Sequence, residues 1–296
     1  MSEFPTQYAA QVGCGMLGPV TTSADDVRPW WRLRDTPVPG GVPDLAKALL
    51  WAELAIVLLV SLGRSAIYSV VSIVSALTAP GPLSAQAANL NNSLAPDRPW
   101  LDLTYQLLRI GFALVPVALA AYLLIRSGSN LKQVWARDGG WSTWRDWGRG
   151  AWLAAGVGSV GVVFYLATFA LGTNLTVVAQ SLPGEWWRVP VLVLAAAEAA
   201  VLEEFVVLGF VQVRLRQIGF GDSAAIGLAA LLRGSYHLYQ GLGGFVGNVA
   251  MGLLFGWLFR RWGRVMPFVV AHTLLDVGAF VGYALLAGRV DWLPTL

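Results

Sequence analysis

Two adjacent carboxylates, Glu203 and Glu204, lie near the middle of the apolar stretch formed by residues 195–216. In a helix that rises by about 1.5 Å per residue, Glu203 lies about 16 Å from Arg214 at the end of this stretch. That depth is close to the midplane of a bilayer whose hydrocarbon core is about 30 Å thick. A charge at this depth is costly, so acids inside a membrane helix indicate a functional site.

The chain contains only two histidines, and both lie in later apolar stretches. His237 follows Arg233 by four residues and His272 precedes Asp276 by four, so each pair shares one face of its helix. With helix tilts of roughly 20°, these side chains and the two glutamates fall within a depth band of about 10 Å. We therefore expect both imidazoles and one glutamate to line a single cavity, with the second glutamate bracing the first.

These residue types support two kinds of chemistry. A buried carboxylate next to imidazoles can act as a general base on water when burial and neighbouring groups tune its pKa. Two histidines and a carboxylate, here His237, His272 and Glu203, also match the ligands of a zinc ion. Hydrogen bonding between helices and a path for protons or ions are the alternatives for polar groups at this depth.

The composition indicates a membrane protein. Hydrophobic residues make up 56% of the 296 residues, charged residues make up 12%, and the mean hydropathy is +0.60. Soluble domains carry about twice this charged fraction. The net charge of +3 comes from arginines between apolar runs, which indicates membrane topology and not nucleic-acid binding. The single cysteine, Cys14, excludes an internal disulfide and a cysteine-rich zinc site.

The sequence predicts an all-α, polytopic bundle of seven, or seven to eight, membrane helices. Residues 1–43 are expected to form a poorly ordered cytoplasmic tail, residues 44–296 the bundle, and residues 187–286 its functional core. Residues 78–100 and 126–149 are expected to be loops. The first apolar run is long, and we expect its end to lie along the interface in preference to a tight hairpin of two short spans. The predicted spans are 48–77, 103–125, 151–171, 187–213, 223–239, 245–259 and 265–286.

Lysine and arginine are unevenly distributed over the segments between these spans. Fourteen of them fall on the side of the N-terminus and three on the opposite side. The positive-inside rule then places the N-terminus in the cytoplasm. The expected location is the bacterial plasma membrane, with the lipid bilayer as surroundings and no nucleic acid as partner.

The order of the polar motifs resembles the CPBP family of intramembrane proteases, which contains CAAX proteases and bacteriocin-processing enzymes and is also called the Abi family. The resemblance covers about a third of the chain. The family motif Glu-Glu-x-x-x-Arg is met by Glu203 and Glu204, with Leu208 in the place of the arginine. The motif Phe-x-x-x-His is met by His237, with Arg233 in the aromatic place. The third motif, His-x-x-x-Asn/Asp, is met by His272 and Asp276.

The resemblance implies an endopeptidase that hydrolyses a peptide bond of a membrane protein or lipidated peptide, such as a prenylated CAAX-type substrate or a leader peptide. It implies Glu203 or Glu204 as the base, imidazoles that position water, and His272 with Asp276 at the oxyanion. Family members are described as metalloproteases or as glutamate proteases, so a zinc cofactor stays open. The alternatives are a catalytically inactive scaffold or immunity protein and a proton-coupled transporter, although repeated halves with broken helices are not evident.

The two departures from the family motifs, Leu208 and Arg233, suggest that Arg233 replaces the missing arginine. An arginine at membrane depth needs an anionic partner, and few acids lie near Arg233 in the sequence. We therefore expect Arg233 to pair with Glu203 or Glu204 from the neighbouring helix, where the family uses an arginine at the position of Leu208. A guanidinium can hold a carboxylate in a fixed geometry. The alternative is that Arg233 extends toward the nearer membrane interface.

Overall fold

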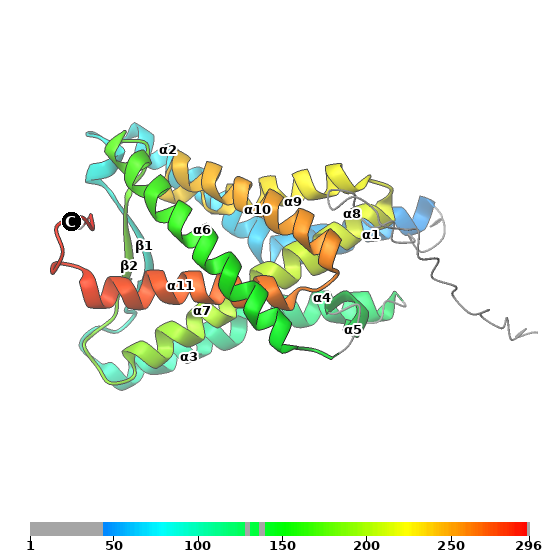
Figure 1. Ribbon diagram of the computed structural model, residues 1–296, viewed down its shortest axis with the longest axis horizontal. Coiled ribbons are helices and arrows are strands. Elements are labelled where there is room, and N and C mark those ends of the chain that lie inside the picture. Colours follow the sequence, from blue (N-terminus) through cyan, green and yellow to red (C-terminus); the bar gives the residue numbers. More distant parts are fainter. Residues whose placement is uncertain (1–43, 128–130, 136–139, 295–296) are drawn as a thin grey trace, which may run out of the picture. The chain divides into compact units, whose positions relative to one another are not determined.

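A computed structural model describes residues 44–127, 131–135 and 140–294, and the predicted tail at residues 1–43 lies outside this part. The described residues are mostly helical, and the long helices lie side by side (Figure 1). The first apolar run forms two helices, α1 (Asp44–Leu59) and α2 (Leu62–Thr78), with a bend of 56° between them. The run is therefore neither one straight span nor a tight hairpin.

The next helices follow the predicted spans. Pro99 occupies the first turn of α3, where a missing backbone N–H costs nothing. A reciprocal capping box between Thr143 and Asp146 starts α6. The elements are α3 (Pro99–Ala113), α4 (Val115–Arg126), α5 (Leu131–Trp135) and α6 (Trp144–Ala170).

The second half of the chain contains the motifs. The helix that carries the glutamates changes from α-helix to π-helix directly after Glu204 and then returns to α-helix. Gly219 (φ 122°) and Gly263 (φ 65°) end α8 and α10 in backbone conformations that favour glycine. The elements are α7 (Arg188–Glu204), the π-helix η2 (Phe205–Val211), α8 (Gln212–Ile218), α9 (Asp222–Tyr236), the 3₁₀ turn η3 (Leu238–Gln240), α10 (Leu242–Trp262) and α11 (Met266–Leu286).

The described residues are mostly helical, as predicted, and contain in addition one small two-stranded sheet that was not predicted from the sequence. The 3₁₀ turn η1 (Leu83–Ala85) precedes the strand β1 (Ala87–Asn92), which pairs in parallel with β2 (Thr176–Ser181). Ala87 lies opposite Thr176 in this register. Both strands come from segments rich in polar or turn residues, and each finds its partner in a distant loop. Local hydrophobic periodicity contains no sign of such a pairing.

Four helices in the described part of the chain are long and apolar enough to cross a membrane, or five if the bent pair α1–α2 is one span. The four are Pro99–Arg126, Trp144–Ala170, Leu242–Trp262 and Met266–Leu286. The predicted number of seven or eight spans is therefore not confirmed.

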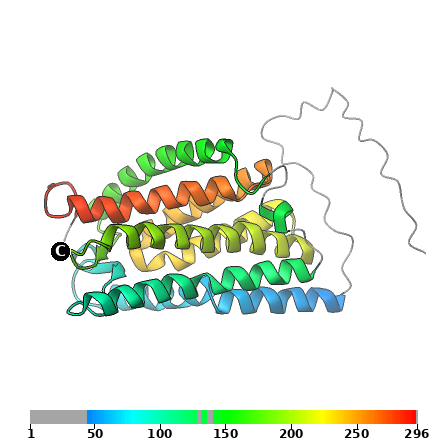
Figure 2. The ribbon, with the colours of Figure 1, turned by 90° about the horizontal axis from the view of Figure 1, so that it is seen from below.

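The arrangement of the helices brings the three motifs together. Helix α11 packs against both α6 and α7 (Figure 2), and α10 packs against α9 (Figure 1). Every residue of η2 is buried, so this segment forms the centre of the main hydrophobic core. Glycines allow α9 and α10 to approach closely: a Cβ at Gly252 would lie 2.9 Å from the Cα of Ala230. Helix α9 also packs against η2, directly after α7, so the three motif helices α7, α9 and α11 are neighbours around the end of α7.

This close approach gives a first testable prediction. A Cβ at Gly234 would lie 2.9 Å from the backbone oxygen of Phe245, whereas a Cβ at Gly227 in the same helix would meet nothing within 4 Å. We expect Gly234→Ala to destabilise the protein by about 1–3 kcal/mol through overpacking. Gly227→Ala should be neutral or slightly stabilising, because alanine is the better helix former. Thermal unfolding in detergent measures both variants, and equal stabilities would contradict the close packing of α9 on α10.

Candidate active site

Glu204, the last residue of α7, forms the buried centre of the polar cluster. Its side chain is completely buried, and its Oε1 accepts a hydrogen bond of 2.6 Å from Nη1 of Arg233 on α9. Nδ1 of His272 on α11 lies 2.9 Å from the same oxygen. One carboxylate oxygen therefore connects three helices inside the apolar core, and the charge of Glu204 is balanced by a guanidinium that is itself fully buried.

Glu203 occupies a different and more accessible position. Its side chain is 14% exposed, and its Oε2 accepts a hydrogen bond of 2.8 Å from the hydroxyl of Tyr236. Nη2 of Arg233 lies 3.7 Å and Nε2 of His272 lies 4.0 Å from this same oxygen. The two glutamates thus share the neighbours Arg233 and His272, but only Glu203 retains some exposure.

His272 lies between carboxylates. Its Nδ1 faces Glu204, as described above, and its Nε2 lies 3.4 Å from Oδ2 of Asp276, one turn further along α11. This is the shared helix face that the spacing of four residues predicts. Nη2 of Arg233 also lies 3.3 Å from Nδ1, so the imidazole is oriented by one acid at each ring nitrogen and by a guanidinium at Nδ1.

His237 lies beside this cluster and has a defined hydrogen-bonding pattern. Its Nδ1 lies 3.0 Å from the backbone carbonyl oxygen of Arg233. A carbonyl oxygen only accepts hydrogen bonds, so Nδ1 carries the proton and Nε2 of the neutral ring has a free lone pair. In the described part of the chain, His237 forms no direct hydrogen bond or ion pair with either glutamate. Its link to them passes through Arg233 and Tyr236.

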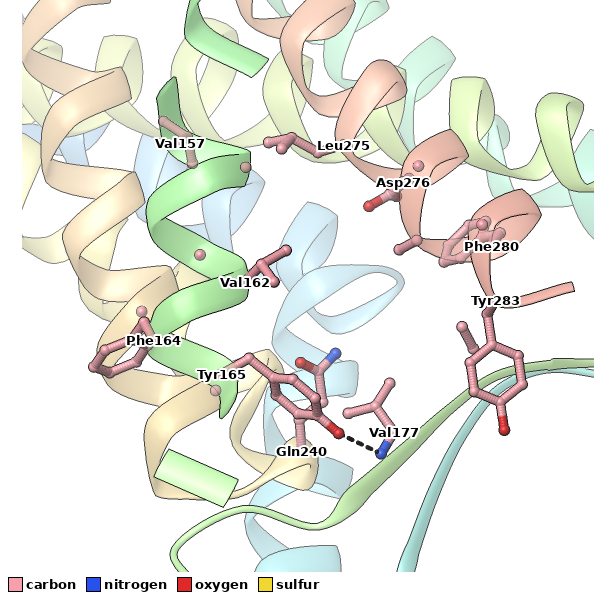
Figure 3. A pocket seen from close by; sticks show the side chains of 18 of the residues that line it. Val157, Val162, Phe164, Tyr165, Val177, Gln240, Leu275, Asp276, Phe280 and Tyr283 are labelled. Carbon is pink, nitrogen blue, oxygen red and sulfur yellow. Dashed lines mark hydrogen bonds between the residues drawn. The ribbon is translucent and has the colours of Figure 1, made fainter. Parts of the chain in front are cut away.

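A cavity of about 740 Å³ adjoins the cluster, and His237, His272 and Asp276 are among the residues that line it. Neither Glu203 nor Glu204 is among them, so the prediction that both imidazoles and one glutamate line a single cavity is correct only for the imidazoles. Most of its wall is apolar and comes from α6 and α11, with Val177 and Ala179 of β2 closing one side. Figure 3 shows Val162 and Phe280 on facing helices, with Asp276 directed between them. The backbone N–H of Val177 donates a 3.2 Å hydrogen bond to the hydroxyl of Tyr165, which ties β2 to α6.

The predicted pairing of Arg233 with a glutamate is observed, and the structure gives its physical reason. Leu208, at the place of the family arginine, lies in the π-helix and is buried in the apolar core. The guanidinium of Arg233 enters instead from α9 and lies over the ring of Phe255, with its Cζ 5.5 Å from the ring centroid. The negative charge of Glu204 is thus neutralised from a neighbouring helix.

The residues proposed as zinc ligands do not fit a metal site in this arrangement. Among the described residues, no group of three or more His, Cys, Asp and Glu side chains could hold a metal ion. Oε2 of Glu203 and Nδ1 of His272 also lie 3.7 Å and 3.3 Å from Nη2 of Arg233. A metal cation at this point would meet a buried positive charge, which disfavours the set of His237, His272 and Glu203.

Tyr236 is the functional candidate that sequence reasoning missed. It contacts Glu203 through its hydroxyl and lies three residues after Arg233, so both side chains leave α9 on the same side. This spacing was a usable signal, because an arginine and a tyrosine on one buried helix face both need polar partners. A buried tyrosine is nevertheless common in protein cores, and its sequence neighbours alone do not identify its partner.

Residues 185–278 match the family model described as type II CAAX prenyl endopeptidase Rce1-like. The matched segment covers about a third of the chain and contains all the motif residues from Glu203 to Asp276. No curated protein and no solved structure matches the chain. The apolar helices and this match together indicate an integral membrane protein. Over residues 185–278, the segment that builds the polar cluster, the chain is a match to the Rce1-like CAAX endopeptidase family, which confirms the resemblance inferred from the three motifs.

Proposed function

We propose that this protein is an intramembrane endopeptidase of the CAAX-protease kind in which Glu203 activates the attacking water. The supporting observation is the difference between the two glutamates. Glu204 is fully buried and held by Arg233 and His272, whereas Glu203 keeps 14% of its side chain exposed beside His272, which lines the cavity. A general base must reach water, so Glu203 suits this role and Glu204 suits a bracing role.

The proposed reaction needs only side chains of this cluster. Glu203 takes a proton from water while the water oxygen bonds to the carbonyl carbon of the scissile peptide. The lone pair on Nε2 of His237 accepts a hydrogen bond from the same water and orients it. The carbon–nitrogen bond then breaks, and the protonated Glu203 returns its proton to the departing amine. The products are a carboxylate and an amine, as peptide hydrolysis requires.

His272 has the proposed role of stabilising the negative charge that develops on the carbonyl oxygen, and Asp276 that of orienting the imidazole, because a carboxylate has no N–H or O–H to donate. Donors fixed before the reaction are effective, because they need no reorganisation when the charge appears. Asp276, 3.4 Å from Nε2 of His272, and Glu204, 2.9 Å from Nδ1, hold the ring in place. Both His272 and Asp276 line the cavity, which is where a substrate carbonyl would lie.

The proposed substrates are membrane-associated peptides or proteins, because the cavity wall on α6 and α11 is mainly apolar. The two proposed substrate classes are proteins with a prenylated CAAX-type C-terminus and proteins with a leader peptide. We also propose the topology derived from the sequence, with a cytoplasmic N-terminus in a bacterial plasma membrane and seven or eight spans.

The proposed function is tested with the purified protein in liposomes and three fluorescence-quenched peptides. One is a farnesylated CAAX-type peptide, one is the same peptide without the farnesyl group, and one is a leader-type peptide anchored by a membrane helix. We expect cleavage of at least one membrane-anchored peptide and much slower cleavage of the unmodified peptide. Failure to cleave all three, together with an unchanged pattern of membrane peptides after Glu203→Gln in cells, would support an inactive scaffold protein instead.

A chelator distinguishes the two catalytic types. The cluster places a guanidinium against Glu204 and His272, so we expect activity to survive incubation with 1,10-phenanthroline or EDTA. The expected rate is within about twofold of the untreated rate, because no metal ligand is removed. Elemental analysis of the purified protein should find less than stoichiometric zinc. Loss of activity on chelation with recovery on adding zinc would overturn the glutamate mechanism.

A further inference from the structure

Tyr236 is a buried side chain to which the proposed reaction assigns no role. It is the last residue of α9, only 5% of its surface is exposed, and its hydroxyl donates a 2.8 Å hydrogen bond to Oε2 of Glu203. An ionised carboxylate only accepts hydrogen bonds, so the direction of this bond is fixed. The bond occupies one carboxylate oxygen of Glu203, and the remaining oxygen is left for water.

The ring of Tyr236 also contacts the histidine that follows it. The centroids of the Tyr236 and His237 rings are 4.7 Å apart, with an angle of 41° between their planes. Tyr236, at the end of α9, therefore contacts both groups that would bind the attacking water, which are Glu203 and His237. Tyr236 binds Glu203 through its hydroxyl and packs against His237 through its ring. The backbone carbonyl of Arg233 also orients the His237 ring, because it accepts a hydrogen bond from Nδ1.

We propose that Tyr236 is a positioning residue for Glu203, an inference that rests on the proposed peptidase function. Its hydroxyl selects one rotamer of the glutamate, in which the second carboxylate oxygen is directed to the water held by His237. Neither Tyr236 nor Glu203 is among the described residues that line the cavity, and the hydroxyl of Tyr236 is bonded to Glu203, so Tyr236 acts on the reaction through this carboxylate. Without it, the glutamate side chain has more rotational freedom and is correctly placed for a smaller fraction of the time.

The substitution Tyr236→Phe removes the hydroxyl and keeps the ring. Hydrogen bonds to charged groups are the stronger class, so we expect kcat to fall by about 10- to 100-fold. KM should stay within about twofold, because Tyr236 does not line the cavity. Tyr239→Phe is the matched control: its hydroxyl accepts a 3.1 Å hydrogen bond from Gln240, and its removal should leave kcat unchanged. A purely structural role for Tyr236 would lower stability without this selective loss of kcat.

Two results would overturn the inference: a kcat for Tyr236→Phe within twofold of the wild type, or a loss confined to KM. These results differ from those expected if the proposed peptidase function is wrong, because the wild-type protein would then cleave none of the peptides. A second measurement does not depend on activity or on the phenylalanine variant. With 3-fluorotyrosine placed at position 236, the ¹⁹F resonance should shift on Glu203→Gln and stay constant on Glu185→Gln. A resonance unaffected by Glu203→Gln would show that the hydroxyl does not bind this carboxylate, and would refute the proposal.

Discussion

Replacing Glu203 by glutamine should lower the rate of peptide cleavage by about 10²- to 10⁴-fold, the range that loss of a general base produces. The amide preserves the size of the side chain and can still accept the hydrogen bond from Tyr236, but it cannot take a proton from water. The protein should therefore stay folded, with an unfolding temperature close to that of the wild type. Initial rates on a membrane-anchored peptide in liposomes, measured with thermal unfolding of the same preparation, check both expectations.

Glu185→Gln is the control for this substitution, because Glu185 lies in the loop before α7 and outside the cluster. It should leave the cleavage rate unchanged. Glu204→Gln should also reduce cleavage, but together with a loss of stability, since it leaves the Arg233 guanidinium without its fully buried partner. A fully active Glu203→Gln variant beside an inactive but stable Glu204→Gln variant would reverse the two assigned roles.

Replacing Arg233 by methionine should destabilise the protein by about 3–5 kcal/mol, as expected when one member of a buried ion pair is removed. Methionine fills part of the same volume, so the main effect is the uncompensated charge of Glu204 in the core. Cleavage should be lost as well, because the Arg233 guanidinium also lies 3.7 Å from Oε2 of Glu203 and 3.3 Å from Nδ1 of His272. Unfolding in detergent with increasing denaturant measures the loss of stability.

The double variant Arg233→Met with Glu204→Gln separates charge from shape. Removing both charges together should recover most of the stability that Arg233→Met alone loses, because no ion is left buried without a partner. Cleavage should stay low, since the bracing of His272 by the Glu204 carboxylate is gone. A double variant no more stable than Arg233→Met would show that the ion pair is not the source of the effect.

The polar cluster was largely predictable, because its determinants are short-range in sequence. Spacings of four residues place His272 and Asp276 on one helix face, and the cost of an unpaired charge predicts a partner for Arg233. The choice between Glu203 and Glu204 was not predictable. It depends on the rotation of α7 relative to α9 and α11, which is decided by packing between helices and not by the pattern along one of them.

Other features were missed for a similar physical reason. The π-helix after Glu204 changes the number of residues per turn without any proline or glycine at its first residues, so the sequence contains no conventional signal of it. The strands β1 and β2 are six residues each and stabilise one another across a long separation, which a search of local windows cannot detect. The role of Tyr236 likewise depends on a contact between two helices, because Tyr236 and Glu203 are 33 positions apart in the sequence.

The pairing of β1 with β2 has a consequence for how the protein is made. Ala87 and its partner Thr176 are separated by 89 positions, so β1 leaves the ribosome long before its partner strand exists. Helices α3, α4, α5 and α6 are all synthesised in the interval. Contacts of such long sequence separation form late, because the intervening chain has to be ordered before they become favourable. Since Val177 and Ala179 of β2 form part of the cavity wall, the cavity is completed only after α6 and β2 have been synthesised. A nascent chain that pauses before β2 has been synthesised would lack the part of the cavity wall that Val177 and Ala179 form.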